Sequence, residues 1–98
     1  MMKNADKACD LLKSLAHPHR LGIVCRLIDG KASVGELAEF VGLRDSTVSQ
    51  HLSLLRKDGI VTTRREGQII WYSIKDDSAR RLVELLHSIY CKNRKEGK

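Results

Sequence analysis

Residues 46–58 read STVSQHLSLLRKD, and the two faces that this segment would form as a helix differ in chemistry. Val48, Leu52 and Leu55 recur at the spacing that places apolar side chains on one helical face. The opposite face carries short, polar and uncharged side chains, namely those of Ser46, Thr47, Ser49, Gln50 and Ser53. A helix that only faces solvent usually carries Glu and Lys at such positions. We therefore expect this face to approach the edges of nucleic-acid bases.

A shorter helix is expected just before this segment. Ser33-Val34-Gly35-Glu36 has the S-x-x-E form of a capping box, in which the serine hydroxyl and the glutamate carboxylate satisfy backbone N–H groups. Gly42 ends the helix, and a tight connection leads to residue 46. Residues 33–58 are thus predicted to form a helix-turn-helix, although a helical hairpin in a small bundle would show a similar pattern.

The flanking segments complete a mainly α fold with one small β-hairpin. Helical spacing predicts helices over 5–16, from Pro18 to Gly30, and over 76–91. The β-rich runs 60–65 and 68–74 surround Glu66-Gly67 and predict a hairpin, with Ile70, Tyr72 and Ile74 facing the core. This order is that of a single winged helix-turn-helix domain, residues 1–98, of the α+β class, with a wing at 60–74.

A small domain cannot easily cover the apolar stripes of both terminal helices. Helices 5–16 and 76–91 are each strongly apolar on one side, so we expect them to form the surface of a homodimer.

The composition favours an anionic partner. The chain has 98 residues and a net charge of +6, and its aromatic content of 4% is too low for the stacking surfaces of single-strand binders. No apolar run approaches the roughly 20 residues of a membrane span. No export signal is evident, so we expect a cytoplasmic protein with no membrane contact and with reduced cysteines at positions 9, 25 and 91.

Several stretches together resemble the ArsR/SmtB family of bacterial dimeric repressors. They are KSLAHPHRLGIVCRL (13–27), SVGELA (33–38), STVSQHLSLLRKDGIV (46–61) and RREGQIIWYSI (64–74). The resemblance runs from about Ala8 to Cys91. It implies a homodimer, with no enzymatic activity and no cofactor, that binds a pseudo-palindromic double-stranded operator and releases it on sensing an inducer.

The resemblance also assigns candidate DNA contacts. Base readers are Ser46, Thr47, Ser49 and Gln50, because Gln can contact adenine and Thr can touch a thymine methyl. We expect Arg56, Lys57, Arg64, Arg65 and Gln68 to contact phosphate or the minor groove. His51 is expected to be structural or to contact phosphate. Position 44 carries Arg, whereas many relatives have a Ser there that caps the helix. We therefore expect Asp45 or Ser46 to cap it here.

The metal-sensing pattern of the family is absent. The helix after Ser33 lacks the family's Cys-x-Cys, and residues 77–79 lack its Asp-x-His. Glu84, His87 and Cys91 could share a helical face and bind a metal ion together with a partner subunit, but their spacing does not match the family motif. We expect no metal site and keep a metal-responsive repressor as the alternative.

Cys25 and Cys91 resemble the two cysteines of the family's persulfide- and redox-sensing branch. That resemblance implies a disulfide or polysulfide link between them that releases DNA. Arg26 and Lys92 follow these cysteines, and nearby cations favour the reactive thiolate, although sequence neighbours on a helix point apart. The alternatives are an inert core cysteine at position 25 and a thiol-insensitive DNA-binding protein. Cys9 is expected to pack within the apolar stripe of its helix.

Overall fold

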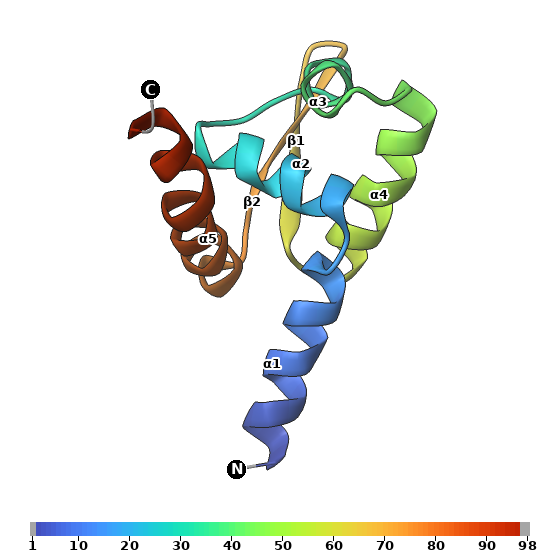
Figure 1. Ribbon diagram of the computed structural model, residues 1–98. Coiled ribbons are helices and arrows are strands. Elements are labelled where there is room, and N and C mark those ends of the chain that lie inside the picture. The colour runs from blue at the N-terminus through green and yellow to red at the C-terminus, as the bar shows by residue number, and fades with distance from the viewer. Residues whose placement is uncertain (1, 97–98) are drawn as a thin grey trace.

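The computed structural model describes the backbone of residues 2–96 and the side chains of residues 2–91. The ends of the expected domain, residues 1 and 97–98, lie outside this range. The element order is α1 (Met2–Leu15), α2 (Pro18–Ile28), α3 (Val34–Val41), α4 (Asp45–Lys57), β1 (Val61–Glu66), β2 (Ile69–Ile74) and α5 (Asp77–Glu96) (Figure 1). The predicted order of helices and hairpin is confirmed, although α1 begins earlier and α5 continues further than expected.

Helix α2 lies at the centre of the domain and packs against α3, α5 and β2. Its Ile23, Val24 and Leu27 are buried, because three of its sides meet other elements. The apolar stripe of α4 is buried as predicted. The remaining core side chains come from α1, α3, β1 and α5 and from the segments between elements, namely Leu15, Ala32, Leu37, Ala38, Ile60, Val61, Ala79 and Val83.

The helix-turn-helix is held by local signals. Glu36 N donates to Ser33 Oγ at 3.3 Å and Ser33 N donates to Glu36 Oε1 at 3.0 Å, which completes the predicted capping box of α3. Gly42 ends α3 in the left-handed conformation, with φ of 74°. The expected cap of α4 by Asp45 or Ser46 is wrong. Arg44 occupies the N-cap with no side-chain cap bond, and Asp45 instead places its negative charge in the first turn.

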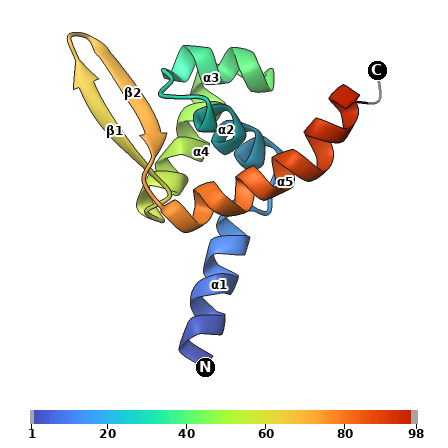
Figure 2. The same ribbon diagram turned by 90° about the vertical axis from the view of Figure 1, so that its left-hand side faces the viewer.

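Strands β1 and β2 form an antiparallel wing whose register runs from Val61 opposite Ile74 to Glu66 opposite Ile69. The turn residues are Gly67 and Gln68, one position later than expected, and Gly67 has a φ of +64°. Tyr72 and Ile74 pack against the core as predicted, but Ile70 is 43% exposed. Ile70 lies toward the tip, where the wing has left the helices (Figure 2).

A backbone bridge joins the wing to the loop between α2 and α3. Ala32 N donates to Tyr72 O at 3.1 Å, and Tyr72 N donates to Ala32 O at 2.8 Å. The base of the wing is therefore fixed to the body of the domain, while its tip projects.

Helix α1 projects from the body, and residues 2–10 are exposed along it (Figures 1 and 2). Cys9 belongs to this part and is exposed in the single chain, so its packing stays a prediction for the dimer. Large apolar side chains are also exposed at Leu12, which is 52% exposed, and on α5 at Leu85 and Tyr90, which are 56% and 68% exposed. No helix in the described part of the chain is long and apolar enough to cross a membrane.

Candidate nucleic-acid interface and thiol pair

The polar face of α4 is open to solvent. Ser46, Ser49 and Gln50 are exposed and Thr47 is half-buried. Val48, Leu52 and Leu55 on the other side are fully buried and fix the helix to the body. The helix therefore presents short hydrogen-bonding side chains on a rigid support, which is the arrangement that base reading in a major groove requires.

His51 faces the body of the domain. Its ring centroid lies 4.8 Å from that of His17, and Arg20 Nε donates to His51 Nδ1 at 3.3 Å. Partial burial, helped by the charges of His17, Arg20 and His19, lowers the pKa of His51. The ring is thus an uncharged contact between α2 and α4 at neutral pH.

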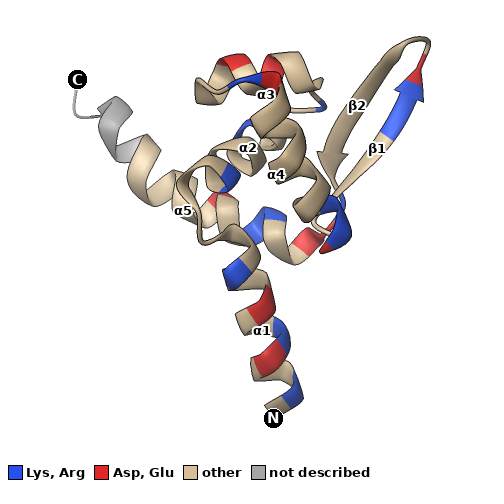
Figure 3. Cartoon of the chain, turned by 90° about the vertical axis from the view of Figure 1, so that its right-hand side faces the viewer, with Lys and Arg blue, Asp and Glu red and all other residues tan. Residues whose placement is uncertain are grey.

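Cations surround the polar face at the end of α4 and along the wing (Figure 3). Arg56, Lys57, Arg64, Arg65 and Gln68 are all exposed. Because side chains alternate along a strand, the two wing arginines lie on opposite faces, Arg64 opposite Trp71 and Arg65 opposite Ile70.

Glu66 is paired with two cations near the tip of the wing. Lys31 Nζ lies 3.2 Å from Glu66 Oε1, and Arg64 Nε lies 3.6 Å from Glu66 Oε2. Lys31 also lies over the Trp71 ring, 5.0 Å from its centroid. The sequence analysis missed Lys31, because no local pattern links it to a strand that begins 30 residues later.

The two candidate sensing thiols belong to helices that pack together. Cys25 lies on α2 and Cys91 on α5, and both are free and half-buried. Burial raises the pKa of the Cys25 thiol, and the nearby charges of Cys91 and Asp29 raise it further. Arg26, the next residue along the helix, is not among the causes of this shift, and its Nη1 donates to Gly30 O at 3.3 Å. The Lys92 side chain lies outside the described residues.

Comparisons with known proteins agree with this geometry. Residues 17–63, which span the helix-turn-helix and the start of the wing, match the bacterial regulatory protein arsR family. The transcriptional activator HlyU of Vibrio cholerae is 46% identical over 91 residues, an alignment that covers 93% of this chain and 84% of HlyU. The chain belongs to the arsR family. As a member of that family it is a transcription regulator and not an enzyme.

Solved structures of arsR-family regulators share the fold. Reduced HlyU superposes with a TM-score of 0.89 at 46% identity and covers 93% of this chain and 96% of its own. The transcriptional repressor BigR of Xylella fastidiosa gives 0.85 at 45% identity, with 93% of each chain covered. A homodimeric winged helix-turn-helix DNA-binding domain of Mycobacterium bovis gives 0.79 at 28% identity, covering 97% and 88%. The expected resemblance to the ArsR/SmtB family is thus confirmed, and the similar relatives include HlyU and BigR.

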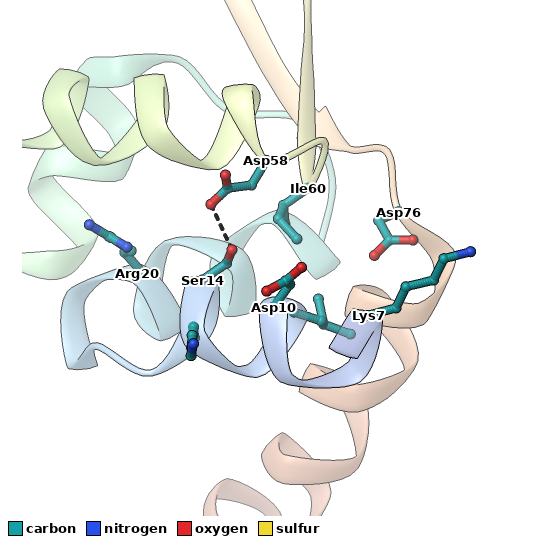
Figure 4. Close-up of a pocket in the computed structure, with 9 residues that line it drawn as sticks. Lys7, Asp10, Ser14, Arg20, Asp58, Ile60 and Asp76 are labelled. Atoms are coloured by element: carbon teal, nitrogen blue, oxygen red, sulfur yellow. Dashed lines mark hydrogen bonds between the residues drawn. The ribbon is translucent and has the colours of Figure 1, made fainter. Parts of the chain in front are cut away.

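In this arsR-family regulator, α1 is tied to the end of α4. Ser14 Oγ donates to Asp58 Oδ2 at 2.6 Å, beside an open cleft of about 560 Å³ (Figure 4). The cleft is lined by positively charged lysine and arginine side chains and by negatively charged aspartate side chains. Ser14 and Asp58 are 44 residues apart, so no sequence pattern pointed to this contact.

Potential metal ligands gather at a place that the sequence analysis did not consider. Among the described side chains, residues 2–91, the group of closely spaced ligands is His17, His19 and His51. Glu84 and His87 are exposed on α5 and do not form such a group with Cys91 within one chain.

Proposed function

We propose that the protein is a dimeric, DNA-binding transcriptional repressor of the cytoplasm, released from its operator when a persulfide or an oxidant modifies Cys25 and Cys91. One observation carries the DNA-binding part of the proposal. An exposed, uncharged polar face on α4 is accompanied by exposed cations in the last turn of that helix and on the wing. Uncharged donors and acceptors suit base edges, and cations suit phosphate.

The proposed dimer uses α1 and α5. Apolar side chains of this size that gather on two projecting helices mark an interaction surface. Leu12, Leu85 and Tyr90 are all more than half exposed in the single chain. The homodimeric domain of Mycobacterium bovis, similar over 97% of this chain, supports a second copy as the partner.

On the operator, each subunit would place α4 in a major groove. Gln50 and Thr47 would read adenine and thymine, with Ser46 and Ser49 beside them. Arg56, Lys57, Arg64, Arg65 and Gln68 would hold phosphate or enter the minor groove, and His51 would brace α4. A two-fold dimer requires its two α4 helices to lie about one helical turn of DNA apart, roughly 34–36 Å.

The proposed sensing chemistry begins at Cys25. Its thiolate attacks the outer sulfur of a low-molecular-weight persulfide, RSSH, which gives Cys25–S–SH and the thiolate RS⁻. The Cys91 thiolate then attacks the inner sulfur, which forms a Cys25–Cys91 disulfide and expels HS⁻. If Cys91 has itself been converted to a persulfide, the same attack gives a trisulfide and HS⁻. In each case the two cysteine thiols are oxidised and one transferred sulfur is reduced to HS⁻, while in the trisulfide the second transferred sulfur stays in the bridge.

This chemistry would change the relation between α2 and α5. A direct disulfide holds two Cα atoms roughly 4.4–6.8 Å apart, and added sulfur relaxes that limit. Helix α2 packs against α3, α4 and the wing, and α5 belongs to the proposed dimer surface. A bond between them would therefore bias the spacing of the two reading helices. A coupling free energy of about 1–3 kcal/mol corresponds to a 5–150-fold change in operator affinity.

The test begins with selection of an operator from genomic DNA by the reduced protein. Fluorescence anisotropy then gives the affinity of reduced, persulfide-treated and diamide-oxidised protein for that operator. We expect a loss of at least fivefold on treatment, abolished by Cys25→Ser and by Cys91→Ser. The matched control is Cys9→Ser, which removes the exposed thiol of α1 and should respond like the parent chain.

Mass spectrometry of the treated protein identifies the bond. A cross-linked pair of peptides containing Cys25 and Cys91, with zero or one added sulfur atom, supports the proposal. Unchanged DNA release by the doubly substituted Cys25/Cys91 serine variant would show that these thiols do not sense the inducer. Failure of the reduced protein to select any DNA would overturn the DNA-binding part independently.

A further inference from the structure

Three histidines from two elements meet at the junction between α2 and the middle of α4. His17 is the N-cap of α2, His19 lies in its first turn, and His51 belongs to α4. One ligand nitrogen from each lies within 4.8 Å of the other two. All three side chains are half-buried, so they are neither dispersed in solvent nor sealed in the core.

We propose that this histidine cluster, His17, His19 and His51, binds one late first-row divalent transition-metal ion of the Zn²⁺ class. Three imidazole nitrogens with water as the fourth ligand make a familiar tetrahedral set for such ions. Imidazole suits Zn²⁺, Co²⁺ and Ni²⁺, whereas Mg²⁺ and Ca²⁺ require oxygen ligands, which this cluster does not supply. The proposal is independent of the Cys25–Cys91 pair.

The rings need only a small adjustment to close on an ion. Zinc–nitrogen bonds of about 2.0–2.1 Å in a tetrahedron place the ligand atoms about 3.4 Å apart. The largest nitrogen separation in the cluster is 4.8 Å, so rotation of side chains could bring the ligands together without moving the helices. Among the described residues no hydrogen bond to the His19 ring is found, so rotation of this ring would break none, although it lies 5.5 Å from the His17 ring between centroids.

An ion would compete with two hydrogen bonds. His17 Nδ1 accepts from His19 N at 3.2 Å, and His51 Nδ1 accepts from Arg20 Nε at 3.3 Å. A neutral ring that accepts at Nδ1 carries its proton on Nε2, so metal binding at Nε2 requires that proton to move to Nδ1. Binding at Nδ1 would replace the hydrogen bonds directly. In both cases the positive Arg20 side chain must turn away.

A bound ion would join the start of α2 to the helix that carries Gln50. Since an ion that binds only the folded protein stabilises it, the melting temperature should rise.

The test is a Co²⁺ titration of the reduced, full-length protein without an affinity tag. We expect one ion per chain, with the visible bands of tetrahedral Co²⁺ and without the intense charge-transfer band of a thiolate ligand. His17→Asn removes a ligand but keeps an oxygen that can cap α2. This variant and His19→Ala should each weaken Co²⁺ binding by about tenfold or more.

The matched controls are His87→Ala, which removes an exposed histidine of α5, and the Cys25/Cys91 double serine variant. Both should bind Co²⁺ like the parent chain. Circular dichroism tests whether the cluster variants fold. If His17→Asn does not fold, NMR of the histidine ring nitrogens in the parent chain provides the test instead. Zn²⁺ should shift the resonances of His17, His19 and His51 and leave that of His87 unchanged. A thiolate band, unchanged binding in His19→Ala, or no binding at one equivalent would overturn the proposal.

Discussion

Ser14 Oγ donates a 2.6 Å hydrogen bond to Asp58 Oδ2, so α1 is tied directly to the residue that ends α4. Ser14 is 8% exposed and lies where α1 leaves its projecting part and enters the body. This contact therefore joins a helix of the proposed dimer surface to the end of the proposed DNA-reading helix.

Ser14→Ala should lower the free energy of unfolding by about 1 kcal/mol, because it removes a hydrogen bond but leaves the exposed Asp58 carboxylate hydrated. Urea denaturation at fixed protein concentration measures the change. Ser53→Ala, at an exposed position of α4, is the matched control and should change stability by less than about 0.5 kcal/mol. Equal effects of the two substitutions would contradict the assigned role of Ser14.

Leu85→Glu should convert the dimer to monomers, because it places a charge in the apolar surface proposed to be buried between subunits. Sedimentation velocity gives the oligomeric state. Phe40→Glu is the control, since Phe40 is 57% exposed, much like Leu85, but lies on α3. A dimer that survives Leu85→Glu and dissociates on Phe40→Glu would place the interface elsewhere.

Arg65→Ala should make operator binding less sensitive to salt, because each lost phosphate contact lowers the slope of log affinity against log salt by about 0.9. Fluorescence anisotropy over a salt series measures the slope. Lys3→Ala removes an equal charge from the projecting part of α1 and should leave the slope unchanged. If both substitutions lower the slope equally, general charge rather than the wing controls binding.

Cys91→Ser should speed alkylation of Cys25 near pH 8. The Cys91 charge is one of the causes that raise the pKa of Cys25, so its removal lowers that pKa and increases the thiolate fraction. Burial is the larger cause and remains, so the pKa should stay above its ordinary value. Rates of iodoacetamide modification, followed by mass spectrometry over a pH series, test this, and Cys9→Ser should leave the Cys25 rate unchanged.

His51 should make the fold less stable in mild acid. Its pKa is lowered in the folded protein, so below its ordinary value of 6.5 the unfolded chain binds more protons. This contribution to the free energy of unfolding is constant above pH 6.5 and falls as the pH decreases toward the lowered pKa. Urea denaturation between pH 7.5 and 5 should show a smaller decrease in His51→Gln than in the parent chain. His87→Gln serves as the comparison and should keep the parent's pH dependence.

Sequence patterns predicted those features that are set by residues close together in the chain. The capping box of Ser33 and Glu36 spans four positions, and the apolar stripe of α4 repeats within one helix, so both could be identified from the sequence. The position of Ile70 could not, because alternation gives the face of a strand but not how far the wing extends beyond the core. Arg44 became the N-cap because its extended backbone allows this without a side-chain bond.

Contacts between distant segments were beyond the sequence patterns. His17 and His51 belong to different helices, and only the packing of α2 against α4 brings their rings together. The pKa of Cys25 also depends on the fold, since burial is the largest cause that raises it. The sequence showed which residue types the protein could use for binding. Only the tertiary structure showed which of these residues lie close together.

The paired backbone hydrogen bonds between Ala32 and Tyr72 have a consequence for how the molecule can respond. They connect the wing to the loop between α2 and α3, so a displacement of that loop would be transmitted to the hairpin through peptide groups. Because these hydrogen bonds join backbone atoms, substitutions of the neighbouring side chains would leave them in place. The helix α4 and the wing would then bind or release the DNA duplex together.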